Sequence, residues 1–198
     1  MEGGAVSDAR TLTARGAARR TVLLDAAIAV VAEAGSARLT HRTVASTAKV
    51  SLASVTYHFS SIDDLRRSMF ERALQIVDDQ LTETAATGTP DELPRLAADY
   101  VIALVEQRRA AVVAMQEMIV AAIHDPALQS TYHAFHHRLA ELLSPCVGGY
   151  RRGLAVAATL EGLILTALTY PGPDAEDLRQ LHAAVLDLIN RLRVEPPR

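Results

Sequence analysis

The stretch from Leu39 to Phe59 constrains the fold more than any other part of the sequence, because it predicts two short helices joined by a tight turn. Thr40 and Ser51 each stand before a helix-forming segment, where a side-chain oxygen can accept hydrogen bonds from the free N–H groups of a first turn. An apolar residue precedes each cap, and another follows at the spacing of a hydrophobic staple. The pattern predicts helices over 42–48 and 52–58 with a three-residue corner between them.

Two helices at this spacing predict a helix-turn-helix motif, whose second helix lies in the major groove of DNA. We expect Val55 and Phe59 to face the core. The residues expected at the DNA surface are Thr40, Arg42, Lys49, Ser51, Leu52, Ala53, Ser54, Thr56, Tyr57 and His58. Short capped helices also occur in helical proteins that bind no nucleic acid, so a helical interaction module without DNA binding is the alternative.

Charge is divided unevenly along the chain. Residues 1–60 hold seven Arg or Lys against four acidic residues, a net charge of +3, whereas residues 61–198 hold thirteen against nineteen, a net charge of −6. We call residues 1–60 the head and residues 61–198 the body. A basic head and an acidic body are expected of a protein that contacts phosphate groups only through its head. The overall charge of −3 therefore does not oppose DNA binding.

Length and cysteine usage favour a globular protein of a reducing compartment. The chain has 198 residues, of which 49% are hydrophobic, and a single cysteine, Cys146, so no disulfide can form within one chain. The first ten residues include acids and no apolar segment of the kind found in secretory signals. The longest apolar run, 154–171, contains Glu161 and predicts a buried helix, not a membrane span. We therefore expect a cytoplasmic protein.

Apolar residues repeat with a helical period in nearly every segment, and no segment alternates as a strand does. The sequence therefore predicts an all-α fold of about nine helices. Residues 1–16 are small and polar and are expected to form a flexible arm. Residues 17–60 are expected to form the helix-turn-helix domain, with a first helix from about Ala17 to Ala34, and residues 61–198 a ligand-binding and dimerisation domain.

The helix expected after Ser61 joins these two domains. Ser61 and Asp64 stand at capping-box spacing, and apolar residues follow at helical spacing for about 25 residues before Thr87-Gly88-Thr89-Pro90 interrupts the pattern. A continuous helix that runs from the helix-turn-helix domain into the ligand-binding domain can act as a lever. A tilt at its far end would move the second helix of the helix-turn-helix, which we call the reading helix.

The head resembles that of the TetR-like (tetracycline-repressor) family of transcriptional regulators. The resemblance is carried by a first helix followed by Ala34-Gly35, Leu39-Thr40, Val44-Ala45, Val50-Ser51, Tyr57-His58-Phe59, Ser61 and Leu65. It implies a homodimer on a palindromic operator of double-stranded DNA. It also implies a helical body that holds an unknown small-molecule effector, and repression that ends when the effector binds.

The resemblance also implies roles for residues of the head. Arg42 stands where the family sends a side chain to a base edge or a phosphate, and an arginine fork on guanine gives about 1–3 kcal/mol of discrimination. Tyr57 and His58 stand at positions commonly aimed at phosphates, although His58 could simply end its helix. The sequence departs from the common pattern, which has Gly at Lys49, Gly or Pro at Ala53, Tyr at Thr56 and Lys at Ile62.

The C-terminal segments predict an assembly surface. After the cap at Asp174, apolar residues follow at alternating spacings of three and four, which is the pattern of helices packed at a shallow angle. The residues expected at the dimer interface are Leu154, Ala158, Leu165, Leu178, Leu181, Val185, Leu188 and Leu192. The alternative is that this seam is buried within one chain.

The middle of the chain contains methionine and aromatic residues, together with side chains that end in a polar group. This mixture predicts an apolar ligand pocket with a few polar groups. The candidate ligand-binding residues are Tyr100, Leu104, Met115, Met118, Ile119, His124, Tyr132 and Phe135. Each of them could instead belong to the plain core.

Metal or redox sensing is the competing function. His133, His136 and His137 have a spacing that can chelate a metal, but no further ligand is clearly placed, so no metal site is assigned. Cys146 follows Pro145 in an expected loop, without an evident activating base. The sequence has no phosphate loop, nucleophile elbow or zinc-protease motif. We therefore expect no enzyme activity, no catalytic residues and no cofactor.

Overall fold

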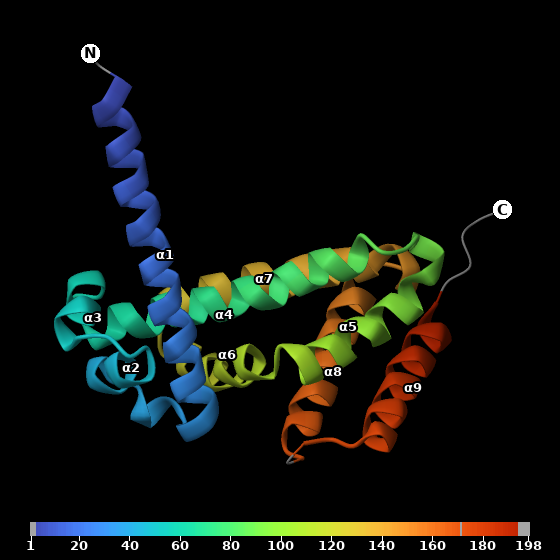
Figure 1. Ribbon diagram of the computed structural model, residues 1–198. Helices are drawn as coiled ribbons and strands as arrows, with labels where there is room; N and C mark the ends of the chain where they lie inside the picture. The colour runs from blue at the N-terminus through green and yellow to red at the C-terminus, as the bar shows by residue number, and fades with distance from the viewer. Residues whose placement is uncertain (1–2, 171, 194–198) are drawn as a thin grey trace. The chain divides into compact units, whose positions relative to one another are not determined.

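The computed structural model describes residues 3–170 and 172–193, which form nine α-helices and two short 3-10 helices, with no strand among them (Figure 1). This confirms the predicted all-α fold of about nine helices. The chain divides into two compact units, one ending at Arg72 and the other beginning at Ala73. The division falls inside a helix, so the first unit includes residues that the sequence assigned to the body.

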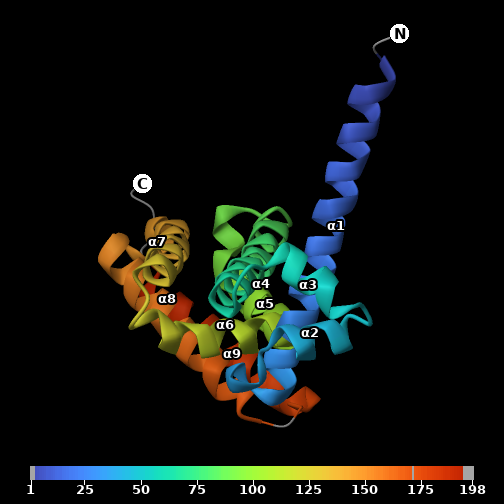
Figure 2. The ribbon, with the colours of Figure 1, turned by 90° about the vertical axis from the view of Figure 1, so that its left-hand side faces the viewer.

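The first unit contains α1 (Gly3–Ala34), a 3-10 turn (Ser36–Arg38), α2 (His41–Thr47), α3 (Leu52–His58) and the first part of α4 (Ile62–Ala85). Figure 2 shows α2 and α3 beside the C-terminal part of α1. Their apolar faces meet in one core of fully buried side chains, which includes Leu23, Val31, Val44, Val55, Phe59, Leu65, Met69 and Phe70.

Helix α1 begins at Gly3, well before the predicted start at about Ala17, so residues 3–16 are helical where the sequence predicts a flexible arm. The reason lies in propensity, since Ala, Arg and Leu recur between the glycines at the start of this segment and Gly16. At the other end, Gly35 has φ 82° and its N–H donates to the Val31 carbonyl at 2.9 Å. The helix therefore ends where the sequence predicts.

Helix α4 begins as the capping pattern predicts. The Ser61 hydroxyl accepts from the Asp64 N–H at 3.1 Å, and the Asp64 carboxylate accepts from the Ser60 N–H at 3.0 Å. In the first unit, α4 is fixed to α1 by its apolar face and by an ion pair between Arg72 and Asp25, with 2.9 Å between Nε and Oδ1.

The second unit contains the rest of α4, a 3-10 turn (Pro90–Glu92) and five further helices. These are α5 (Leu93–Gln107), α6 (Arg109–Ala122), α7 (Pro126–Val147), α8 (Tyr150–Leu168) and α9 (Ala175–Leu192). Helices α7 and α8 pack together along their length, and α9 lies along α5 (Figure 1). The predicted caps at Asp125 and Asp174 accept hydrogen bonds from the first turns of α7 and α9.

Helices α7 and α8 approach very closely at Gly153. A Cβ atom added to Gly153 would lie 2.3 Å from the carbonyl oxygen of Ala140 in α7, so only glycine fits there. Pro145 and Cys146 lie in the last turn of α7, not in a loop as expected, and the helix ends at Gly148 in the left-handed region. Pro145 has no N–H to donate to the preceding turn, and α7 ends two residues later at Val147.

Candidate functional site

Helices α2 and α3 form the predicted helix-turn-helix. The Thr40 hydroxyl accepts from the Thr43 N–H at 3.0 Å, and the Thr43 hydroxyl accepts from the Thr40 N–H at 2.9 Å, which gives a reciprocal cap. The Ser51 hydroxyl caps α3 by accepting from the Ser54 N–H at 3.2 Å. Both caps are confirmed, and α2 begins one residue earlier than predicted.

The corner between the two helices depends on Lys49. It has φ 54°, and among the described residues it is the one non-glycine with positive φ. The next residue, Val50, donates its N–H to the Ala45 carbonyl at 2.9 Å, which closes the end of α2. A left-handed corner explains why glycine suits this position, and lysine adds an exposed positive charge there.

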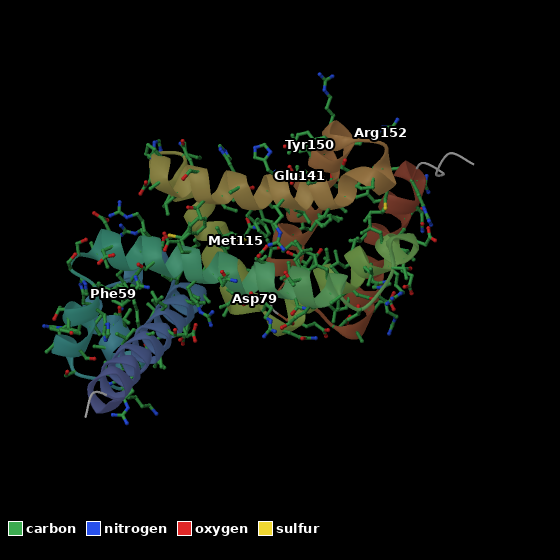
Figure 3. All side chains as sticks on the ribbon, turned by 90° about the horizontal axis from the view of Figure 1, so that it is seen from above. Phe59, Asp79, Met115, Glu141, Tyr150 and Arg152 are labelled. Atoms are coloured by element: carbon green, nitrogen blue, oxygen red, sulfur yellow. The ribbon has the colours of Figure 1, made fainter. Side chains whose placement is uncertain are left out.

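The end of α3 is fixed from two sides by groups that the sequence did not indicate. The Nε2 atom of His41 lies 3.1 Å from the Phe59 carbonyl oxygen. The Phe59 ring is fully buried (Figure 3). The guanidinium of Arg20 lies over this ring, at 4.9 Å from its centroid, and donates to the Ser68 hydroxyl at 2.6 Å. Arg20 thereby joins α1, α3 and α4. Such contacts link residues far apart in the sequence, so no local pattern signals them.

The outer surface of this motif presents the candidate DNA-contacting residues. Those exposed are Thr40, Arg42, Lys49, Ser51, Leu52, Ala53, Thr56 and Tyr57, while Ser54 and His58 are half-buried. The Tyr57 side chain is 85% exposed, an unusual position for an aromatic ring without a partner molecule. The Thr56 hydroxyl donates back to the Leu52 and Ala53 carbonyls at 3.3 and 3.2 Å. The surface therefore combines two cations, short side chains and one projecting phenol, a combination suited to a DNA groove.

The second unit encloses a cavity of about 310 Å³ among α4, α5, α7 and α8. Its walls are almost entirely apolar, and they include Leu81, Leu93, Leu96, Ala97, Tyr100, Leu139, Leu142, Leu143 and Leu160. The lining is completed around the end of α4 and in the last turn of α7 by Thr84, Ala85, Gly88, Thr89, Pro145 and Cys146. This volume lies at the lower limit of small-molecule sites.

A second cavity of about 20 Å³ adjoins the first and shares three lining residues with it, Tyr100, Leu139 and Leu160. It is lined by polar side chains as well, since Gln116, His136 and Glu161 line it together with Met115 and Phe135. The Tyr132 hydroxyl donates to the Glu161 carboxylate at 2.6 Å, and His136 Nε2 lies 3.9 Å from the same oxygen.

The candidate ligand-binding residues fall into three groups. Tyr100 lines both cavities; Leu104, Met115 and Phe135 line the small one; and Met118, Ile119, His124 and Tyr132 line neither. Met118 is buried in the core, and His124 is exposed in the turn after α6. The cavity walls supplied by α4 and by the end of α7 were not predicted from the sequence. Their only signal was leucine at helical spacing, which does not differ from an ordinary core.

Burial changes the acidity of several groups around the cavities. Desolvation, and then its hydrogen bond to Glu161, raises the pKa of Tyr132 far above the usual tyrosine value, and desolvation does the same for Tyr100. Both phenols therefore stay protonated and can donate hydrogen bonds. Burial also raises the pKa of the Cys146 thiol, which disfavours the thiolate that redox sensing would need.

The three histidines of α7 point in different directions. His136 approaches Glu161, whereas the His137 ring stacks on Tyr150 of α8, and its Nδ1 is hydrogen-bonded to the Tyr150 hydroxyl. His133 is exposed, with its ring centroid 6.5 Å from that of His137. Within the described ranges, no group of three His, Cys, Asp or Glu could hold a metal ion.

The predicted dimer residues differ in how far the chain itself covers them. Val185 is fully buried where α9 lies along α5, so that position belongs to the chain's own core. The residues left half-buried are Leu154, Leu178, Leu181, Leu188 and Leu192. Ala158 and Leu165 are exposed on α8, and the Leu165 side chain is 48% exposed. The chain itself thus leaves apolar surface on α8 and α9 uncovered.

Comparisons with known proteins agree with this architecture. Residues 88–191 match the family model described as the tetracyclin repressor-like C-terminal domain, and residues 23–69 match that of the bacterial regulatory proteins of the tetR family. No curated protein matches the sequence. Within the described ranges, every helix is too short or too polar to span a membrane.

Solved structures resemble the chain along nearly its whole length. The multidrug binding protein EbrR complexed with imidazole is 29% identical, with a TM-score of 0.65, over 90% of this chain and 97% of that one. A TetR-family member from Streptomyces coelicolor A3 is 29% identical, with a TM-score of 0.72, over 89% of this chain and 98% of that one. Since the C-terminal family model covers more than half of the sequence, the protein belongs to the TetR family of DNA-binding transcriptional regulators.

Proposed function

We propose that the protein is a homodimeric repressor that leaves a palindromic operator when a small molecule occupies the body cavity. The observation that carries this proposal is the course of α4. Its first half contributes Leu65, Met69 and Phe70 to the core of the first unit, and its second half contributes Leu81 to the wall of the large cavity. Helix α4 therefore belongs both to the first unit, which contains the helix-turn-helix, and to the proposed ligand site.

The two halves of α4 are held by different partners. In the first unit, Arg72 pairs with Asp25 of α1 at 2.9 Å. In the second unit, Asp78 forms an ion pair with Arg138 of α7, and Arg138 also donates to the Thr82 hydroxyl at 3.2 Å. A ligand between α4 and α7 would shift the second set of contacts, and a rigid α4 would transmit the change to α2 and α3. Ligand binding would thereby weaken DNA binding, and the coupling free energy between the two sites measures this effect.

Ligand binding by this fold has support in a similar protein. Structures of the multidrug binding protein EbrR in complex with ethidium and malachite green are 29% and 27% identical to this chain, with TM-scores of 0.65 and 0.63. The large cavity supplies a volume and an apolar lining of the kind that small ligands occupy. We therefore assign the effector site to this cavity.

The DNA contacts are proposed for the exposed residues of α2, the corner and α3, with Arg42 and Lys49 as cations and Tyr57 as a phosphate donor. A dimer places two such motifs on successive major grooves, so the energies of two half-sites add. We assign the dimer interface to the exposed apolar residues of α8 and the half-buried ones of α9.

The direct test is selection of bound fragments from genomic DNA by the purified protein. A palindromic sequence with half-sites about one helical turn apart is expected. Affinity for that sequence should fall steeply with salt and should weaken in Arg42→Ala. If no duplex binds in a salt-dependent manner, the proposal is wrong, and if Arg42→Ala binds as the wild type does, the role of Arg42 is wrong.

A further inference from the structure

We propose that the effector carries a cationic amine on an apolar body, and that Glu161 receives the amine while the large cavity holds the body. This inference rests on the proposed function as a ligand-responsive regulator, and it specifies the chemistry of that ligand.

Glu161 is an isolated negative charge inside an apolar helix. It lies in the middle of α8 between Leu160 and Gly162, and its side chain is only 25% exposed. Among the described residues, no arginine or lysine forms an ion pair with it, and its nearest basic neighbour is His136 at 3.9 Å. A carboxylate with so little water and no fixed counter-charge favours a cationic ligand, because a buried charge is costly unless it is paired.

The hydrogen bonding of Glu161 also leaves room for a donor. An ionised carboxylate can accept about four hydrogen bonds, and the structure supplies one short bond, from the Tyr132 hydroxyl at 2.6 Å. Nearby, the Nε2 atom of Gln116 is buried without a partner and lines the same cavity. Rotation of this amide would place its oxygen there, where it could accept from the same ammonium group.

The sizes of the two cavities divide the ligand into a small head and a large body. The space of about 20 Å³ beside Glu161 admits a group about the size of a water molecule, as an ammonium is. The adjoining space of about 310 Å³ is lined by leucines and offers no charged side chain. Because Tyr100, Leu139 and Leu160 line both spaces, a flexible arm that passes them would connect body to head.

The charge at Glu161 also sets which ligands are excluded. The charges that act on Tyr100 are those of Asp78 and Arg138, which neutralise each other in an ion pair. A carboxylate or phosphate head would therefore meet Glu161 with no compensating cation. The site should select amines over acids and over neutral molecules of the same shape.

The test uses dansylcadaverine, an apolar fluorophore on a flexible chain that ends in a protonated amine, and its N-acetyl derivative, which is neutral. Both are titrated into the full-length protein without DNA, and binding is followed by dansyl fluorescence. The wild type should bind the amine about 10-fold more tightly or better. Glu161→Gln should remove most of that preference and leave the affinity for the acetylated probe unchanged.

The matched control is Glu141→Gln, an equal loss of charge at an exposed position on α7 (Figure 3). It should bind both probes as the wild type does. Equal binding of the two probes by the wild type, or an unchanged preference in Glu161→Gln, would overturn the inference. If Glu161→Gln does not fold, Glu161→Asp, which keeps the charge, should keep the preference for the amine, and its loss would also count against the inference.

The outcomes separate this inference from the proposed function. DNA binding by the unliganded protein is measured independently, as salt-dependent association with the selected operator. A protein that binds its operator but does not prefer the amine remains a regulator whose effector has other chemistry. A protein that prefers the amine but binds no duplex retains the ligand site and loses the regulator assignment.

Discussion

Arg20 of α1 lies over the ring of Phe59, the residue that ends α3, with its guanidinium carbon 4.9 Å from the ring centroid. The same guanidinium donates to Ser68 of α4, so one side chain bridges the reading helix and the helix that follows it. The relationship matters because α3 is only two turns long and cannot hold its own orientation.

We predict that Arg20→Ala lowers the free energy of unfolding by about 1–2 kcal/mol, from the lost cation–π contact and the lost hydrogen bond to Ser68. Operator affinity should fall with it, since α3 loses a constraint. Urea unfolding and fluorescence anisotropy measure the two effects. Arg19→Ala, at the neighbouring exposed position, is the control for loss of positive charge alone. Equal behaviour of the two variants would contradict a bridging role.

Lys49 gives a prediction that separates backbone strain from charge. With φ 54°, a residue with a Cβ is strained by about 1 kcal/mol relative to glycine. Lys49→Gly should therefore be about 1 kcal/mol more stable than Lys49→Ala, less the extra chain entropy of glycine. Both variants should lose about one unit of the salt dependence of DNA binding if Lys49 contacts a phosphate. Equal stability of the two variants would show that the corner is not strained.

The helix-turn-helix was predictable because its signals are local. Thr40 and Ser51 cap helices within three residues of themselves, and each apolar staple is close in sequence. The cavity was less predictable, because its walls come from four helices and only the fold decides which leucines line a space. Tyr100 lines a cavity and Met118 is buried in the core, and the sequence pattern does not distinguish the two positions. The prediction of Val185 at the dimer interface was limited in the same way. The spacing of apolar residues along α9 does not reveal whether the chain itself or a second copy covers them.

Gly153 should tolerate no side chain. A methyl group there would lie 2.3 Å from the Ala140 carbonyl oxygen, which is backbone and cannot rotate away. Gly153→Ala is expected to destabilise the protein by about 1–3 kcal/mol through separation of α7 from α8. Gly16→Ala is the matched control, because no atom lies within 4 Å of the added Cβ, and it should stabilise helix α1 by about 0.5–1 kcal/mol. Urea unfolding at one fixed protein concentration distinguishes the two signs.

The buried tyrosines predict a loss of stability in alkali. The native pKa of Tyr100 is raised above the unfolded value near 10, so the native state keeps a proton that the unfolded state releases. Stability is therefore complete below pH 10 and falls above it, by up to about 1.4 kcal/mol per pH unit for this group. Tyr100→Phe should unfold with a shallower dependence on pH between 9 and 11. Tyr170→Phe, at an exposed position, should retain the wild-type slope.

Leu165 supplies the test of the proposed dimer interface. Its side chain is 48% exposed on α8, beside the small exposed residues Ala158 and Gly162, so a second α8 could approach closely there. Leu165→Arg would place a charge in that interface, and we expect monomers by sedimentation velocity together with a large loss of operator affinity, because one half-site binds alone. Val120→Arg carries the same substitution at a side chain that is 66% exposed on α6, outside the proposed interface, and should remain dimeric. A Leu165→Arg variant that stays dimeric would move the interface away from this face of α8.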